Sequence, residues 1–178
     1  YPQYKAQREE TPEDIRFSVP VIKDILRAYN ITILEVPGYE ADDVIGTIAL
    51  QAGNQGMLTY MMTPDKDYGQ LVRDNVLIYK PGLGNKPAEK MGPAEICAKY
   101  GIKSPKQVID ILGLMGDAVD NVPGCPGVGE KTACTLMQTY DSIEQIYEDP
   151  SHIKGKLREK ILFVTCAVIR KYYIDNKE

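Results

Sequence analysis

The sequence MLTYMMTPDKDYGQLV, residues 57–72, decides the fold that we predict for this chain. Residues 57–62 form a short apolar run that predicts a buried strand, and residues 67–72 predict a short helix after it. The charged triplet DKD at residues 65–67 stands between the two. In an extended segment, Asp65 and Asp67 would point to the same side and could face one cation. A strand that leads through charged residues into a helix is typical of an α/β sheet that binds ligands at the carboxyl ends of its strands.

The neighbouring segments continue this alternation in both directions. Residues 31–36 alternate and are β-branched, which predicts a strand, and a helix is predicted to begin near Ala41. Residues 76–79 predict a third strand. Strands and helices that alternate at this spacing predict a parallel α/β sheet with right-handed connections.

The pattern changes after residue 84, where we predict only helices. Upstream, Thr11 and Pro12 predict the start of a helix that Pro20 is expected to kink or split. We therefore divide the chain near residue 90, into an α/β part of residues 1–90 and a helical part of residues 91–178. The helices predicted in the second part are residues 93–100, one after Ser104-Pro105, residues 130–140, 142–147 and 156–173.

Composition excludes several classes of function. The 178 residues carry a net charge of −4, so any contact with nucleic acid has to come from local basic clusters. Four cysteines without a C-x-x-C pair, and His152 as the only histidine, argue against zinc, disulfides and histidine-assisted nucleophiles. No apolar run is long enough to span a bilayer and no signal peptide is visible, so we expect a cytoplasmic protein. The chain begins at Tyr1 rather than methionine, and we expect a fragment of a longer protein.

Acidic residues occur in short segments, called stations below, where a strand is predicted to end or a helix to begin. Each station has an ordinary explanation: first-turn acids complement a helix dipole, and acids in turns are common. Parallel strands end at one edge of the sheet, however, so the stations are expected to converge, and converging carboxylates need cations. Hard divalent ions prefer such oxygen ligands. The candidate ligands are Glu40, Asp42, Asp43, Asp65, Asp67, Asp117 and Asp120.

Two further segments could contact phosphates. The string VPGCPGVGEKTA, residues 122–133, has glycines at 127 and 129 directly before a predicted helix, so its amides could bind an anion. It could equally be a helix–helix connector, and it lacks the spacing of a P-loop. At the N-terminus, Tyr4, Lys5 and Arg8 combine an aromatic ring with two cations, which suits a nucleic-acid strand but also suits a solvated helix face.

Four segments, in this order, carry a resemblance to a known family: YKAQREETPEDI, GYEADDVIGTIA, TPDKDYGQLV and GLMGDAVDNVPGCPGVGEKTA. They resemble the 5′-nuclease family of bacterial DNA polymerase I, within the flap endonuclease superfamily, over essentially the whole chain. The resemblance implies a twisted, mainly parallel α/β sheet flanked by helices (PIN-like). An all-α DNA-binding subdomain would follow, with a helix–hairpin–helix-type motif near residues 116–140.

The resemblance also implies an activity. The chain would be a metal-dependent 5′→3′ exonuclease and 5′-flap endonuclease of DNA replication and repair, which hydrolyses phosphodiesters with metal-activated water. The seven carboxylates would hold two or three Mg²⁺ or Mn²⁺ ions, and a K⁺ ion would sit at the glycine turn. The partner would be DNA with 5′ ends, flaps, nicks or branches, and polymerase domains would be fused to this one.

By the same resemblance, Lys5, Arg8 and Lys66 would be catalytic residues, the first two of them in a mobile arch through which the 5′ strand passes. The implied DNA contacts are Tyr4, Lys5, Arg8, Gly127, Val128, Gly129, Lys131 and Thr132.

The family's chain also begins with a buried strand that carries an aspartate, and a second aspartate precedes the arch. Both would lie upstream of Tyr1, so residues 1–90 are expected to lack their first strand. This leaves a second hypothesis, a DNA-binding module that cannot assemble a competent site. A third hypothesis is a single-strand ribonuclease of a related toxin-like fold. It is disfavoured because the helix–hairpin–helix-type motif is expected to bind the backbone of duplex DNA.

Overall fold

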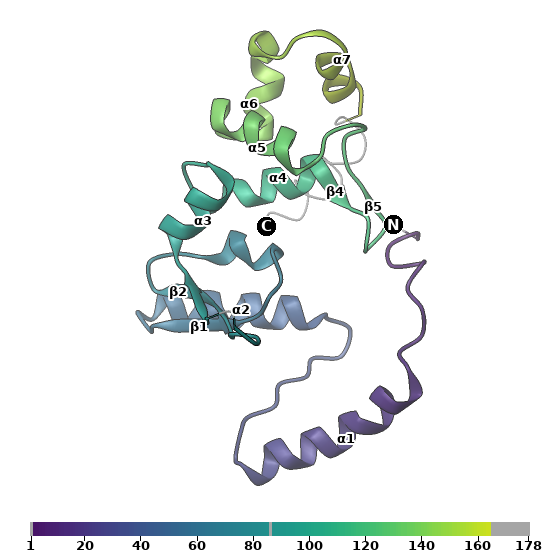
Figure 1. The fold of residues 1–178 in the computed structure, drawn as a ribbon, viewed down its shortest axis with the longest axis vertical. Helices are drawn as coiled ribbons and strands as arrows, with labels where there is room; N and C mark the ends of the chain where they lie inside the picture. Colours follow the sequence, from purple (N-terminus) through teal and green to yellow (C-terminus); the bar gives the residue numbers. More distant parts are fainter. Residues whose placement is uncertain (1, 86, 165–178) are drawn as a thin grey trace.

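The structure is a computed structural model that describes residues 2–85 and 87–164 (Figure 1). An α/β region comes first and a helical region follows it, as the sequence predicts. The elements of the first region are α1 (Glu13–Ala28), α2 (Ala41–Asn54), β1 (Thr59–Met62), the 3-10 helix η1 (Asp67–Leu71), β2 (Val76–Lys80) and β3 (Glu89–Met91). The second contains α3 (Pro93–Tyr100), α4 (Gln107–Met115), β4 (Gly116–Asp117), β5 (Val122–Pro123), α5 (Glu130–Thr139), α6 (Ile143–Glu148), the 3-10 helix η2 (Pro150–His152) and α7 (Gly155–Val164).

The sheet of the first region is small and mixed. Its order is β1-β2-β3, with β1 parallel to β2 and β3 antiparallel to β2. Met61, Val76 and Ile78 alternate with exposed or half-buried residues and are almost fully buried, so one face of the sheet packs into the core. The prediction of an α/β sheet is confirmed, but with one parallel pair and one antiparallel pair it is mixed.

The strand predicted at residues 31–36 does not form. These residues are extended but unpaired, and Ile31, Leu34 and Val36 are exposed. A strand needs a ladder of hydrogen bonds with a neighbour. Within the part of the chain that the structure describes, β1 pairs only with β2, and Figure 1 shows residues 29–40 running away from the sheet toward α1.

The prediction that only helices follow residue 84 is also wrong. β3 returns to pair with β2, with Ile78 opposite Met91. β4 and β5 form a two-residue ladder in which Asp117 stands opposite Val122. Strands of two or three residues are too short to show an alternating pattern, so hydrophobic periodicity could not reveal them.

The first helix stands apart from the rest of the molecule (Figure 1). α1 is one continuous helix through Pro20, rather than the split pair that we considered. None of its 16 residues is buried, although its apolar residues follow a helical period. At the other end of the chain, α7 begins one residue before the helix predicted at 156–173, and residues 165–173 lie outside the described part.

The core of the helical region is formed by α3, α4, α5 and α6. Ile96, Val108, Leu114, Met137 and Ile146 are at most 2% exposed, and α4 packs against α5. Burial of each such side chain contributes about 1.5–3 kcal/mol. This packed unit fixes the position of β4, which follows α4 without a break.

Gln107 ties this core together through four hydrogen bonds. Its side-chain amide donates to the carbonyls of Met137 (2.9 Å) and Tyr140 (3.0 Å). Its Oε1 accepts from the N–H groups of Lys103 (2.8 Å) and Ser104 (3.2 Å). Gln107 is 5% exposed, so water cannot replace these bonds easily.

We therefore expect Gln107→Leu to lower the free energy of unfolding by about 2 kcal/mol or more, since it leaves buried backbone groups without partners. Urea unfolding followed by circular dichroism measures this. Gln51→Leu, at an exposed position of α2, is the matched control and should change stability by less than about 0.5 kcal/mol. Equal effects of the two substitutions would contradict this role for Gln107.

Candidate metal centre and nucleic-acid interface

Most of the predicted carboxylates meet in one pocket of about 390 Å³. It is bounded by the N-terminal segment, the start of α2, the loop after β1 and the turn between β4 and β5. Six of the seven predicted carboxylates line it, from stations almost 80 residues apart in the chain. The charged residues of its lining are Lys5, Arg8, Glu40, Asp42, Asp65, Lys66, Asp67, Asp117 and Asp120.

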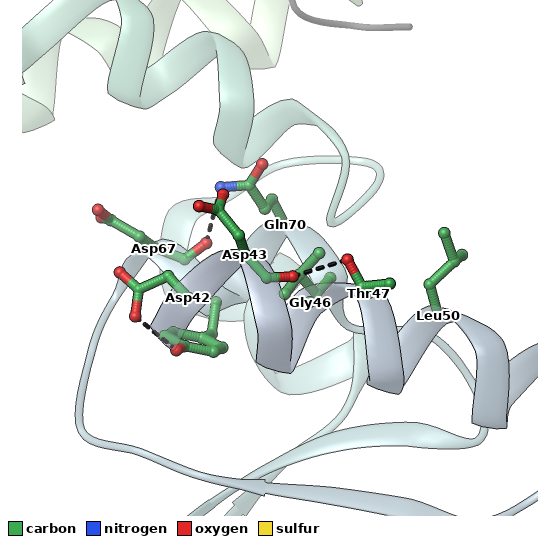
Figure 2. Close-up of a pocket in the computed structure, with 9 residues that line it drawn as sticks. Asp42, Asp43, Gly46, Thr47, Leu50, Asp67 and Gln70 are labelled. Atoms are coloured by element: carbon green, nitrogen blue, oxygen red, sulfur yellow. Dashed lines mark hydrogen bonds between the residues drawn. The ribbon is translucent and has the colours of Figure 1, made fainter. Parts of the chain in front are cut away.

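Asp43 is the carboxylate that does not line this pocket. Its Oδ2 accepts from the backbone N–H of Glu40 (3.0 Å), as part of a capping box at the start of α2. Figure 2 shows Asp43 beside Gln70 in a neighbouring pocket, while Asp42 accepts a hydrogen bond from the hydroxyl of Tyr68 (2.7 Å). Asp43 is thus the N3 residue of this capping box; the ordinary alternative that we gave for this station was that its acids complement the helix dipole.

Asp65 and Asp67 share the pocket, but the reason differs from the one we predicted. We expected an extended segment, with both side chains on one side. Lys66 is instead in the helical region of backbone space, and the N–H of Asp67 donates to Oδ1 of Asp65 (3.0 Å) in a tight turn. Burial raises the pKa of Asp67 above its usual value.

Asp117 and Asp120 are held by a tight turn. Oδ1 of Asp117 accepts from the N–H groups of Val119 (2.8 Å) and Asp120 (3.3 Å). Although burial opposes the effect, Lys66 and these N–H groups lower the pKa of Asp117. Gly116 has a positive φ of 70°, which lets the chain bend directly before Asp117.

Three basic side chains stand between the carboxylates. The ammonium of Lys66 lies 3.1 Å from Oδ1 of Asp67 and 3.0 Å from Oδ2 of Asp117. Burial alone would lower the pKa of Lys66, but these two partners outweigh it and the pKa is raised.

The other two cations come from the N-terminal segment. Lys5 pairs with Glu40, and Arg8 pairs with Asp120. The hydrogen bond from Lys5 lowers the pKa of Glu40. The N-terminal segment is therefore held against the acidic pocket by charge.

The donor chemistry of this pocket fits a divalent cation. Six carboxylates and three cations leave it three charges negative, and all of its acidic donors are hard oxygens. Among residues 2–85 and 87–164, no three acidic side chains already form a metal-binding group. The basic side chains between the carboxylates supply positive charge that an ion would otherwise supply.

The glycine turn has the geometry of an anion seat. Gly127 is left-handed (φ 81°), Val128 is buried at 5% exposure, and Gly129 is the N-cap of α5. Val128 thus anchors the turn in the core. No side chain caps the first turn of α5, which leaves its amides available to an anion. Lys131 is exposed in that turn and Thr132 is half-buried.

Tyr4 lies at the edge of the acidic pocket. Its hydroxyl donates to Oε1 of Glu40 (3.3 Å), and the ammonium of Lys5 lies 4.8 Å from the centre of its ring. Burial raises the pKa of Tyr4. Its side chain remains 43% exposed, so a face of the ring is accessible for stacking.

Sequence reasoning missed three residues of this region. Tyr68 holds Asp42, while Gln7 and Asn121 join the N-terminal segment to the turn after β4. The sequence did contain a signal for Asn121. Its backbone is left-handed (φ 58°), and asparagine is one of the few residues other than glycine that adopt this conformation readily. Nothing local marked Gln7 or Tyr68, whose partners are distant in sequence.

Comparison with known proteins defines the class. The family described as "5'-3' exonuclease, N-terminal resolvase-like domain" matches residues 1–101, and "5'-3' exonuclease, C-terminal SAM fold" matches residues 103–166. The chain belongs to the 5′-3′ exonuclease family, a family of phosphodiester hydrolases.

Relatives of the chain within that family include DNA polymerase I. The chain is 38% identical over 170 residues to DNA polymerase I of Mycobacterium tuberculosis, covering 96% of this chain and 19% of that protein. It is 42% identical over 149 residues to a 5'-3' exonuclease of Aquifex aeolicus, covering 84% of this chain and 50% of that protein. The chain therefore spans about one fifth of the polymerase and half of the exonuclease.

A solved structure shares the fold. The T5 D15 protein co-crystallised with metal ions superposes with a TM-score of 0.71 at 21% identity, covering 98% of this chain and 71% of that one. The fold is that of an α/β nuclease domain followed by a helical region. No helix among the described residues is both long and apolar enough to cross a membrane.

The close approach of Gly116 and Gly124 yields a prediction. A Cβ on Gly124 would lie 2.2 Å from the carbonyl carbon of Met115 and 2.4 Å from the nitrogen of Gly116. Gly124→Ala must therefore shift the β4–β5 ladder that carries Asp117, and we expect a loss of about 1–3 kcal/mol in unfolding free energy. Chemical denaturation measures this.

Gly129→Ala is the matched control, because its Cβ would meet nothing within 4 Å and its φ is −101°. The control should lose about 1 kcal/mol or less, the cost of placing alanine at this N-cap without a steric clash. Wild-type stability of Gly124→Ala would show that the ladder is not tightly packed.

Proposed function

We propose that this chain is a divalent-metal-dependent 5′→3′ exonuclease and 5′-flap endonuclease domain that acts on DNA in replication and repair. The observation that carries the proposal is the meeting of carboxylates from the start of α2, the loop after β1 and the β4–β5 turn in one pocket. Such a cluster has little structural value by itself, since like charges repel. Membership of the 5′-3′ exonuclease family supports the same conclusion.

The proposed cofactors are two or three Mg²⁺ or Mn²⁺ ions. Glu40, Asp42, Asp65 and Asp67 would hold them on one side of the pocket, with Asp117 and Asp120 on the other. Asp43 would contribute by shaping the start of α2 rather than as a direct ligand. Solved structures of T5 5'-exonuclease with divalent zinc and of the T5 D15 protein with metal ions support divalent ions as the cofactors.

Bound ions would supply a water of lowered pKa and neutralise charge on the phosphate. The chain's own residues position the substrate. Lys5, Arg8 and Lys66 are the cations at the pocket, and we assign them contacts to the phosphates beside the scissile bond. The exposed ring of Tyr4 would stack on a base of the 5′ strand.

The helical part would bind duplex DNA away from the cleavage site. We propose a division near residue 90, with a helix–hairpin–helix-type motif at residues 116–140. Gly127, Val128 and Gly129 would present backbone amides to a phosphate, with Lys131 and Thr132 beside them and a K⁺ ion at the turn. Solved structures of relatives with DNA, such as the catalytic core of Rad2 with its substrate, support a DNA partner.

The proposed setting follows from the relatives. DNA polymerase I of Mycobacterium tuberculosis is about five times the length that this chain matches, so we propose that polymerase domains accompany this domain in the whole protein. The proposed location is the bacterial cytoplasm.

A second function is a DNA-binding module without cleavage. The observation that favours it is that Lys5, Arg8 and Lys66 already neutralise much of the pocket, and no three acidic residues of the described chain form a metal-binding group. Cleavage assays on a 5′-flap substrate with Mg²⁺ decide between the two functions, since only the first predicts product.

Removing one carboxylate tests the proposed ligands. We expect Asp65→Asn and Asp117→Asn each to lower the rate of flap cleavage about 100-fold or more, because a neutral amide stabilises an ion poorly. DNA affinity should change little. Single-turnover cleavage and fluorescence anisotropy measure the two quantities.

Asp74→Asn, at an exposed position between η1 and β2, is the matched control and should cleave at the normal rate. Normal turnover by Asp65→Asn or Asp117→Asn would refute the assignment of that residue.

The glycine turn is tested by salt dependence. Lys131→Gln removes one proposed phosphate contact, so duplex affinity should fall and the slope of log affinity against log salt should shrink by about one. Lys154→Gln, at an exposed position before α7, is the control and should keep the wild-type slope. An unchanged slope for Lys131→Gln would remove this residue from the DNA interface.

A further inference from the structure

The N-terminal segment, residues 3–8, is attached to the turn at residues 117–121 by two different kinds of contact. The first kind is ionic: Arg8 pairs with Asp120, and Lys5 pairs with Glu40 and lies 3.9 Å from Asp120. These contacts use the same carboxylates that we propose as metal ligands. An ion bound by Glu40 or Asp120 would compete with them for the same oxygens.

The second kind involves no charged group. The backbone N–H of Lys5 donates to the carbonyl of Asp120 (2.9 Å), and the side-chain amide of Gln7 donates to the carbonyl of Ala118. The side-chain amide of Asn121 donates to the carbonyl of Gln3 (2.7 Å). A metal ion does not compete for these bonds, so they keep the segment in place by a separate route.

Asn121 has a particular place among these contacts. Its backbone is left-handed (φ 58°), and its N–H donates to the carbonyl of Ala118, so its conformation is part of the turn that holds Asp117 and Asp120. From that conformation its side chain reaches Gln3, two residues before Lys5. The residue thus links the proposed metal ligands to the segment that supplies two of the pocket's three cations.

We propose that Asn121 is a positioning residue that docks residues 3–8 on the acidic pocket, and that divalent-ion binding and docking of this segment oppose each other. Lys5 and Arg8 serve as built-in counter-cations when the segment is docked. Ion uptake would release them, and they would then be available to a phosphate. The second half of this proposal rests on the proposed metal site; the role of Asn121 does not.

Opposition of this kind is reciprocal. If an ion weakens docking by some factor, docking weakens ion binding by the same factor. The loss of one hydrogen bond changes such an equilibrium by roughly 2- to 10-fold. Both directions can be measured on the same protein without any nuclease assay.

The test substitution is Asn121→Gly, which removes the amide and keeps the left-handed backbone free of strain. Asn30→Gly is the matched control, since Asn30 is also left-handed (φ 56°) but lies after α1. Limited digestion of the full chain with trypsin, in EDTA, reports docking through the cleavage rates after Lys5 and Arg8. Cleavage after the exposed Lys154 in the same samples is the internal reference.

We expect Asn121→Gly to be cleaved after Lys5 and Arg8 roughly 2- to 10-fold faster than wild type, with Asn30→Gly unchanged. Cleavage of Asn121→Gly at the wild-type rate overturns the positioning role. Thermal unfolding of both variants identifies a global loss of structure. In that case Gln7→Ala, which leaves the turn's own residues intact and removes the Gln7–Ala118 contact, tests whether uncharged contacts dock the segment; cleavage at the wild-type rate would then overturn docking by these contacts.

Calorimetric titration with Mn²⁺ tests the opposition. We expect Asn121→Gly to bind Mn²⁺ roughly 2- to 10-fold more tightly than wild type, and Mn²⁺ to speed cleavage of the wild type after Lys5 and Arg8. If Mn²⁺ binds but Asn121→Gly does not bind it more tightly and Mn²⁺ does not speed cleavage of the wild type, ion binding and docking of the segment do not oppose each other. Absence of Mn²⁺ binding overturns the proposed metal site together with the opposition, while digestion in EDTA still decides the role of Asn121.

Discussion

Repulsion among carboxylates is the constraint on which the rest of this structure depends. Six acidic side chains share one pocket, and two unit charges 4 Å apart near a protein surface interact by about 4 kcal/mol. Lys66 offsets part of this repulsion between Asp67 and Asp117. Lys5 and Arg8 do the same for Glu40 and Asp120. The chain thus provides three of the cations that these carboxylates need.

The scaffold around the pocket is built to hold these charges at fixed positions. Asp43 caps α2 and thereby orients Glu40 and Asp42, while η1 begins at Asp67. On the opposite side, the packed helices α4 and α5 fix the β4–β5 ladder, and Gly116 and Gly124 approach too closely to admit a side chain. One side of the pocket thus belongs to the α/β region and the other to the helical region, so the site depends on how the two regions pack together.

The sequence was sufficient to predict the elements that repeat a clear pattern. β2 and α3 form where residues 76–79 and 93–100 predicted them, because burial favours their apolar residues at a regular period. The sequence was insufficient wherever a partner that is distant along the chain decides whether a segment forms a strand or buries its apolar face. Residues 31–36 have the composition of a strand but no neighbour to pair with, and α1 has an apolar face that nothing in the described chain covers.

The same distinction applies to the candidate site. The carboxylate stations were visible because acids at strand ends and helix starts form a local pattern. Asp43 takes its place in the capping box through Glu40, only three residues away. That Lys5, Arg8 and Lys66 stand between the other acids, by contrast, depends on contacts between residues as many as 112 positions apart. Tyr68 escaped notice for this reason, since an isolated polar residue carries no signal of its partner.

The most direct measurement of the central claim is the anomalous diffraction of crystals grown with Mn²⁺, which locates each ion against individual oxygen atoms. Our account predicts ions inside the acidic pocket, within about 2.5 Å of carboxylates from at least two stations, one of them Asp65 or Asp67 and the other Asp117 or Asp120. Ions bound only at isolated surface acids, with Lys66 still between Asp67 and Asp117, would contradict it.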